Sequence, residues 1–268
     1  MRIVVTGTGP GSIGLATAEA LTALGHEVVT STRATMDLTD RASVEAYAKG
    51  VVAGGPVDVL VNNAGVHLDL GNSLKEPRLV DGQEVHWRTN YLGTVQLTRA
   101  LLPALLERAA ETGDARVVHV VSKLHARGRT DAYFSEFGDR YNSWDAYGTS
   151  KLGLVQDAAS LAEKYGDRGL RAYSLHPGAV ATQISGRGLE TSPLLSRLHA
   201  AVAPLEKVFL KSPATGARTS VFCATDPGAA SGYYADSKPK APASQAGDDA
   251  ARAALWARTE SWLNGEQS

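Results

Sequence analysis

Short apolar runs rich in β-branched residues alternate along the chain with segments whose apolar residues recur every three or four positions. The runs predict strands, and the three- and four-residue spacing predicts helices. Strands are predicted at residues 2–6, 27–31, 57–61, 116–121, 170–175 and 232–235. Helices are predicted at residues 13–24, 40–52, 85–110, 144–164, 213–224 and 248–263. This alternation, with strands apolar on both faces, indicates an α/β fold with a doubly wound parallel sheet.

The second predicted strand is followed too closely by the next helix for the usual edge strand to form. It ends near Arg33, and Met36 and Asp37 follow almost at once. Neighbouring parallel strands need a crossover of a dozen or more residues, which this link cannot supply. We therefore expect six strands, with strand 27–31 at the sheet edge and the strand that usually lies outside it missing or vestigial.

Composition narrows the class of protein. The chain has 268 residues without an internal repeat or a linker, which predicts one domain over 1–268. A net charge of −1 gives no electrostatic reason to expect a nucleic acid or an anionic membrane as partner. The single cysteine, Cys223, excludes an intramolecular disulfide and favours a reducing compartment. The N-terminus leads straight into a strand and no apolar run approaches ~20 residues, so we expect a cytoplasmic protein.

A glycine-rich turn links the first predicted strand to the first helix. Its glycines allow backbone amides to approach a pyrophosphate at the positive N-terminus of the helix. Three of them match the G-x-G-x-x-G spacing, in the strand–turn–helix context that this motif requires. The predicted cofactor-binding residues here are Gly7, Gly9, Gly11, Ser12, Ile13 and Gly14. The turn predicts a Rossmann-like site for a dinucleotide.

Arg33, at the end of the second predicted strand, bears on the choice of dinucleotide. A carboxylate at this point would bind a ribose 2′-hydroxyl, whereas an arginine suits a 2′-phosphate. The chain has Ser31, Thr32 and Arg33 here and no carboxylate before Asp37. We therefore expect NADP(H) in preference to NAD(H). The alternative is that Arg33 is only a solvated arginine at a strand end.

Tyr147 and Lys151 lie four residues apart in a predicted helix, so their side chains share one face. An ammonium beside a phenol favours the phenolate, which is expected to lower the tyrosine pKa from its ordinary value of about 10. Tyr147 can then exchange a proton with a carbonyl or alcohol oxygen. Ser122 follows the apolar run before this helix, and Asn90 lies further upstream.

Together these residues resemble the short-chain dehydrogenase/reductase family, over nearly the whole chain. Its adenine-side segment is matched by Asn63, Ala64 and Gly65, and its nicotinamide-side loop by Pro177, Gly178, Val180 and Thr182. With the outer strand missing after Arg33, Asp37 and Leu38 are expected to lie against the adenine. Within the family, Ser122-x-x-His125 and the step of 25 residues from Ser122 to Tyr147 are most similar to retinol-dehydrogenase-type reductases.

The resemblance implies a role for each of four catalytic residues. Tyr147 exchanges the proton with the substrate oxygen while hydride passes between the nicotinamide and the substrate carbon. Ser122 donates a hydrogen bond to that same oxygen, as an oxyanion-hole donor does. Lys151 lowers the Tyr147 pKa and holds the nicotinamide ribose, and Asn90 orients a water that relays protons from Lys151. The implied reaction is reversible NADP(H)-dependent reduction of a ketone or aldehyde.

Two segments bear on substrate and association. Residues 183–212 carry apolar side chains at helical spacing and are expected to form a lid, which favours an apolar or aromatic substrate. Residues 129–145 are an insertion that either caps helix 144–164, giving a monomer, or walls the substrate and leaves a homodimer possible; we favour the monomer.

No cluster has zinc-site spacing, so no metal is expected. Two alternative functions remain open. One is a protein that binds the dinucleotide without redox turnover, and the other is an enzyme that reduces C=C or C=N bonds.

Overall fold

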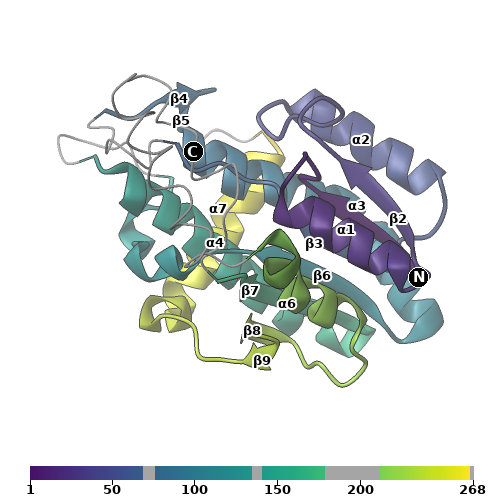
Figure 1. Ribbon diagram of the computed structural model, residues 1–268. Coiled ribbons are helices and arrows are strands. Elements are labelled where there is room, and N and C mark those ends of the chain that lie inside the picture. The colour runs from purple at the N-terminus through teal and green to yellow at the C-terminus, as the bar shows by residue number, and fades with distance from the viewer. Residues whose placement is uncertain (69–75, 135–140, 179–211, 266–268) are drawn as a thin grey trace, which may run out of the picture.

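A mostly parallel sheet crosses the computed structural model, which describes residues 1–68, 76–134, 141–178 and 212–265 (Figure 1). Among these residues the sheet has seven strands in the order β2-β1-β3-β6-β7-β8-β9. The bounds are β1 Arg2–Thr6, β2 Glu27–Ser31, β3 Val59–Asn62, β6 Ala115–Val120, β7 Leu170–His176, β8 Gly232–Ala235 and β9 Lys238–Pro239. The predicted doubly wound α/β fold is confirmed.

The sheet edge confirms one prediction and corrects another. β2 lies at the edge and pairs only with β1 in the described sheet, as the short link after Arg33 predicts. The count of six holds for the parallel strands but is wrong for the whole sheet, because β9 pairs antiparallel with β8. Asp236 and Ser237 have φ values of 51° and 57°, as a tight hairpin turn requires. A strand of two residues carries no periodicity from which it could be predicted.

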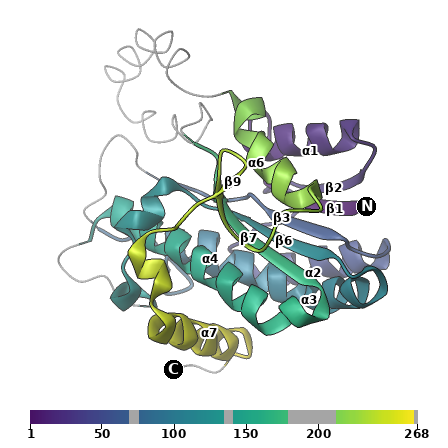
Figure 2. The same cartoon turned by 90° about the horizontal axis from the view of Figure 1, so that it is seen from below.

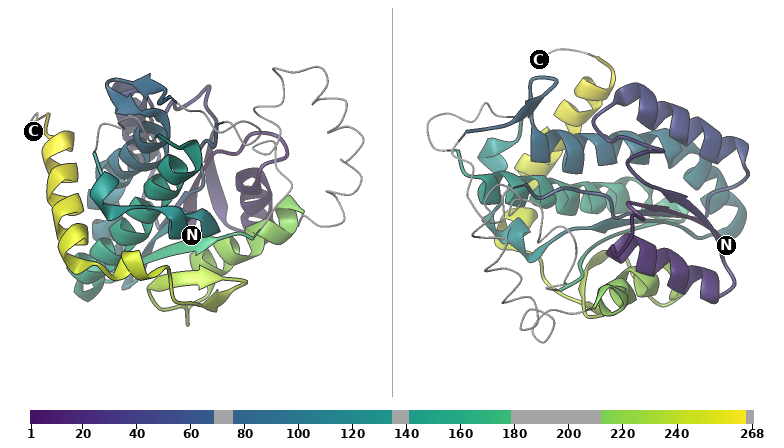
Figure 3. Two further views of the ribbon diagram at one scale, coloured as in Figure 1. Left: turned by 90° about the vertical axis from the view of Figure 1, so that its left-hand side faces the viewer. Right: turned by 45° about the horizontal axis from the view of Figure 1, so that its top comes forward.

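Helices cover both faces of the sheet (Figure 2). Their bounds are α1 Ile13–Ala23, α2 Arg41–Ala53, α3 Thr94–Thr112, α4 Ser143–Tyr165, α6 Pro213–Thr225 and α7 Asp249–Leu263. Alternate strand residues point to opposite faces: Val4 packs in the core under α2, α3 and α4, whereas Ile3 packs in the core under α1 and α6. α7 lies on the side of α4 away from the sheet (Figures 2 and 3).

Residues 85–110 are helical as predicted, but the helix contains a π-helical stretch. A hairpin of β4 (Leu79–Val80) and β5 (Gln83–Glu84) precedes it, and Asp81 and Gly82 turn that hairpin with positive φ. A π-helix, η1, then covers Trp87–Gly93 before α3 begins. Single π-helical turns within helices occur frequently at functional sites. This one contains Asn90.

The predicted insertion and lid are described only in part. Residues 129–134 and 141–145 belong to the described part, which includes the short 3-10 helix η3 (Thr130–Ala132). Tyr133 is buried, stacks on Trp87 and donates a hydrogen bond to Gln156 of α4. The predicted lid lies outside the described residues except for Ser212, which caps α6. The single-domain prediction for 1–268 remains a prediction.

Candidate active site

The four predicted catalytic residues come from three elements and meet beyond the carboxyl end of β6. Asn90 lies in η1, Ser122 follows β6, and Tyr147 and Lys151 lie on α4. A Cβ added to Gly65 would lie 3.1 Å from Asn90 Oδ1 and 3.2 Å from Lys151 Nζ, so both side chains crowd the same glycine. The Ser122 side chain lies near enough to Tyr147 to act on the pKa of the phenol. The structure therefore brings all four together.

Asn90 is fixed by the backbone that follows the Asn-Asn-Ala-Gly segment. Its Oδ1 accepts a hydrogen bond from Val66 N at 2.7 Å, and its Nδ2 donates to Val66 O at 2.9 Å. Nδ2 also donates to Ser150 Oγ on α4 at 3.2 Å. Asn90 is completely buried. One side chain thus joins η1, α4 and the loop after β3.

Ser122 begins a 3-10 helix, η2 (Lys123–Arg127), whose first turn it caps by accepting a hydrogen bond from Leu124 N. His125 Nδ1 donates to Ser122 O at 2.7 Å, and its Nε2 accepts from Ala243 N at 3.0 Å. Both imidazole nitrogens are used, so His125 holds the serine backbone in place. Burial lowers the His125 pKa, which favours this neutral form.

Burial shifts the pKa values of both Tyr147 and Lys151, and the Tyr147 shift is opposite to the prediction. Burial raises the pKa of Tyr147 to about 12, although the nearby Ser122 side chain opposes the rise. Burial also lowers the pKa of Lys151 to about 8. The expected lowering of the Tyr147 pKa is wrong for this structure, because loss of solvation outweighs an ammonium 5.7 Å from the centre of the tyrosine ring. At neutral pH the phenol is protonated.

His67 is a neighbour of Tyr147 that the motifs did not reveal. Its ring stacks on the Tyr147 ring with centroids 4.1 Å apart and planes 12° from parallel, and Trp144 meets it edge-on at 4.8 Å. Burial lowers the His67 pKa to about 4, with help from nearby His86 and Lys151. His67 Nε2 is buried without a hydrogen-bond partner in the described structure. Its position two residues after Gly65 was the only available signal.

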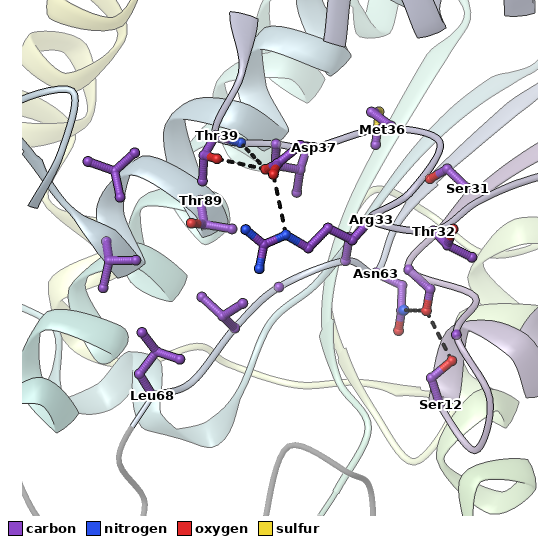
Figure 4. A pocket seen from close by; sticks show the side chains of 18 of the residues that line it. Ser12, Ser31, Thr32, Arg33, Met36, Asp37, Thr39, Asn63, Leu68 and Thr89 are labelled. Atoms are coloured by element: carbon purple, nitrogen blue, oxygen red, sulfur yellow. Dashed lines mark hydrogen bonds and ion pairs between the residues drawn. The ribbon is translucent and has the colours of Figure 1, made fainter. Parts of the chain in front are cut away.

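A cavity of about 310 Å³ lies beside the catalytic residues, lined by the glycine turn, the loop after β2, the loop after β3 and the β4–β5 hairpin (Figure 4). Among the predicted cofactor residues, those that line it are Gly7, Gly9, Ser12, Ile13, Arg33, Asp37, Leu38, Asn63, Ala64 and Gly65. Gly11 has φ +70° in the same turn, and Gly14 lies behind it against Asn63 and Gly7.

The turn around the cavity has the form that a pyrophosphate requires. A Cβ on Gly7, which has φ +72°, would lie 2.7 Å from Ala64 Cα, so only glycine lets the two backbones approach. Ser12 caps α1 by accepting from Leu15 N and donates to Gly7 O. The N-terminus of α1 therefore opens onto the cavity, where a dinucleotide's pyrophosphate fits.

Arg33 and Asp37 face each other at the end of the cavity that the loop after β2 lines (Figure 4). Arg33 Nε lies 3.3 Å from Asp37 Oδ2, and the arginine side chain is 82% exposed. Burial opposes ionisation of Asp37, but hydrogen bonds from Thr39 and the nearby Arg33 hold its pKa below its ordinary value. The guanidinium is thus partnered on one side and open to solvent on the other.

The nicotinamide-side loop is only partly described. Pro177 and Gly178 directly follow β7; Gly178 has φ +88°, and its amide donates to His176 Nδ1 at 3.0 Å. Val180 and Thr182 lie outside the described residues. Within the described ranges no group of three or more His, Cys, Asp or Glu side chains could hold a metal ion. Nor do those ranges contain a helix both long and apolar enough to span a membrane.

The chain belongs to the short-chain dehydrogenase family, whose profile matches residues 30–192. Mouse retinol dehydrogenase 12 is 35% identical over 190 residues, covering 70% of this chain and 55% of that protein. Mouse polyprenol dehydrogenase is 34% identical over 95% of this chain and 81% of its own length. The chain therefore spans about half the length of the retinol dehydrogenase it matches. These relatives confirm the resemblance to retinol-dehydrogenase-type proteins.

Solved structures agree on the fold. An uncharacterised protein from Mycobacterium paratuberculosis superposes with a TM-score of 0.72 at 27% identity, over 98% of this chain and 93% of its own. A 3-ketoacyl-(acyl-carrier-protein) reductase from Brucella melitensis, solved with NADH, gives 0.64 at 19% identity, over 87% of this chain and 94% of its own. The family match and these superpositions together place the chain among the short-chain dehydrogenases.

Proposed function

We propose that this protein reduces a ketone or aldehyde with NADPH, and that Tyr147 is the proton donor. The observation that carries the proposal is the meeting of Asn90 and Lys151 at Gly65, a residue that lines the cavity, with Tyr147 protonated at neutral pH one turn before Lys151 on α4. When bound, the dinucleotide supplies the hydride. A phenol with a raised pKa suits the reductive direction, because it holds the proton that a developing alkoxide needs.

Each neighbouring side chain has a definite task in this proposal. Ser122 donates a second hydrogen bond to the substrate oxygen, since its backbone is already fixed by His125. Lys151, which donates to Val120 O at 3.2 Å, keeps a positive charge near the phenol below about pH 8. Asn90 holds the backbone around Val66 and lies where it can pass protons on from Lys151. His67 fixes the plane of the phenol by stacking.

The proposed substrate is apolar. Retinol and polyprenol, named in two relatives, are both apolar allylic alcohols. NADPH consumption over a panel of ketones, aldehydes (an apolar allylic aldehyde among them), enones and imines tests the proposal. We expect turnover with aldehydes or ketones. Turnover only with enones or imines would move the reaction to C=C or C=N bonds, and NADPH binding without turnover of any compound would favour the binding-protein alternative.

We also propose a preference for NADP(H), supported by Arg33 at the rim of the cavity. A charge-assisted contact between guanidinium and phosphate is worth roughly 1.5–3 kcal/mol, which is about ten- to a hundredfold in affinity. Arg33→Ala should weaken NADPH binding by that factor and leave NADH binding nearly unchanged in fluorescence titrations. Equal affinity of the unaltered protein for both dinucleotides would reject the preference.

The proposed state in solution is a monomer in the cytoplasm. α7 packs on α4, the helix that relatives commonly use for association: Leu255 and Trp262 join Leu154 and Val155 in one apolar cluster, and Tyr91 hydrogen-bonds Thr259. The chain's own C-terminal helix thus covers that face, with the partly described insertion packing nearby. Light scattering should give a mass near 28.2 kDa; a mass twice as large would reject the monomer.

A further inference from the structure

Arg88 ties together two walls of the cavity, at the end that the loop after β2 lines. It lies in η1, and its side chain is 1% exposed. Nη1 donates to Leu38 O and Nη2 donates to Thr39 O, each at 2.7 Å. Nε lies 3.4 Å from Asp81 Oδ2 in the turn of the β4–β5 hairpin. One guanidinium therefore bonds the loop after β2 and approaches the hairpin opposite.

The first wall needs such a tether because it is not a strand of the sheet. The loop 36–39 follows the edge strand β2 without pairing with it, and its residues line the cavity. Buried carbonyls need donors, and here Arg88 supplies two of them. Gly93, one turn further along η1, lets Leu38 approach so closely that a Cβ on the glycine would collide with Leu38 O. The loop 36–39 thus packs closely against η1.

The second wall depends less on Arg88. Arg78, Val80 and Val85 line the cavity from the hairpin side. Asp81 has φ 52°, and its side chain is 69% exposed, so its contact with Arg88 is largely screened by solvent. The hydrogen bonds from Arg88 to Leu38 O and Thr39 O therefore contribute more to holding the two walls than the ion pair with Asp81 does.

We propose that Arg88 is a positioning residue for the adenosine half of the dinucleotide, acting through the carbonyls of Leu38 and Thr39. This rests on the proposed function only in requiring that the protein bind a nicotinamide dinucleotide. Arg88 does not reach the catalytic groups through any of these bonds. Its removal should therefore weaken adenosine binding and leave the chemical step alone.

The test compares Arg88→Met with the parent in titrations of NADPH, adenosine 2′,5′-bisphosphate and nicotinamide mononucleotide. We expect at least about tenfold weaker binding of the first two, because two hydrogen bonds from a charged donor are lost. Binding of the mononucleotide and kcat at saturating NADPH should stay within about twofold. Arg88→Lys, which keeps the charge but lacks the fork, should fall between the parent and Arg88→Met.

Arg116→Met is a matched control. Arg116 is equally buried and also donates to two backbone carbonyls, those of Cys223 and Asp226, but it lies on β6 away from the cavity. The Arg116→Met substitution should lower thermal stability. It should not change the affinity for adenosine 2′,5′-bisphosphate or for nicotinamide mononucleotide. Asp81→Asn, which suits a positive φ, should weaken NADPH binding by about twofold at most.

The outcomes separate the inference from the proposed function. A parent that binds no NADPH would reject the proposed function itself. If the parent binds NADPH, then equal loss of both fragments in Arg88→Met, or a loss matched by Arg116→Met, would overturn the role of Arg88. Should Arg88→Met fail to fold, Arg88→Lys carries the same test: adenosine-fragment affinity equal to that of the parent would overturn the inference.

Discussion

Lys151 and Asp157 are buried on the same helix, α4, within two turns of each other, yet they differ in whether the charge has an ion-pair partner. Lys151 donates to one backbone carbonyl and forms no ion pair among the described residues, and burial lowers its pKa to about 8. Burial also opposes ionisation of Asp157, but Arg99 at 2.6 Å and His119 at 3.0 Å hold its pKa at about 2.

On the proposed function, Lys151 is buried for its chemistry, whereas Asp157 is buried for its structural role. The Asp157 charge is paired, and the network continues through Arg99 to Glu260 of α7 and through His119 to Asn62 of β3. Such a charge ties elements together. The Lys151 charge is desolvated with only the hydrogen bond to Val120 O to compensate it, which costs stability and, on the proposed function, leaves the ammonium free to act on a neighbour. Groups perturbed by desolvation in this way cluster at active sites.

The largest expected effect is loss of turnover in Tyr147→Phe. The phenol hydroxyl is the proposed proton donor, and removing a positioned general acid costs on the order of a hundred- to ten-thousandfold. The ring and its stacking on His67 remain, so NADPH binding and thermal stability should be nearly unchanged. Steady-state kinetics with a titration and a melting curve check this. Turnover equal to the parent's would remove Tyr147 from the mechanism.

On the structural side, Asp157→Asn should leave the chemistry largely intact but cost stability. Removing one partner of a buried ion pair typically costs 3–5 kcal/mol, because it leaves a buried charge short of compensation; here Arg99 would keep only Glu260, whose side chain is 40% exposed. Urea unfolding gives the value. The double variant Asp157→Leu, Arg99→Met removes both charges and should recover part of the lost stability. A double variant that loses more free energy of unfolding than Asp157→Leu and Arg99→Met together would contradict this view of the network.

Much of the fold and of the catalytic set could be predicted because both depend on local patterns. The strands β1, β2 and β8 match their predicted bounds, since β-branched runs between helices are distinctive. Tyr147 and Lys151 share a helix face by spacing alone. Asp157 and His119 were not predicted as partners, because nothing local in β6 or α4 signals a contact between them.

The contacts that the sequence could not supply are tertiary or depend on small shifts of backbone bonding. Arg88 bonds the carbonyl of Leu38, 50 residues away, through backbone atoms that every residue has. The π-helix η1 changes the hydrogen-bond register without changing the apolar pattern, so the sequence predicted the helix over 85–110 but not its π-helical stretch. The Tyr147 pKa was mispredicted because spacing shows a neighbouring charge but not the loss of solvent.

The smallest of the three effects is a gain of stability in Lys151→Met. The pKa of Lys151 falls from 10.5 to about 8 on folding, and a shift of that size corresponds to up to about 3 kcal/mol of destabilisation by the buried charge. Below pH 8 both states hold the proton and the whole penalty is present. Between pH 8 and 10 the unfolded chain binds more protons than the folded one, so parent stability from this group rises with pH.

Urea unfolding at several pH values tests this, with Lys164→Met as the control. Lys164 is exposed near the end of the same helix, so its loss should change stability by no more than about 0.5 kcal/mol at any pH. Lys151→Met should be more stable than the parent at pH 7, and the gain should shrink steadily toward pH 10. Destabilisation of Lys151→Met at pH 7 would mean that the ammonium is compensated in the folded protein, and the contrast with Asp157 would fail. A stability gain of Lys151→Met that does not change with pH would mean that the gain comes from packing and not from removal of the charge. Loss of turnover alongside the predicted gain would identify Lys151 as a group kept for chemistry at the expense of stability.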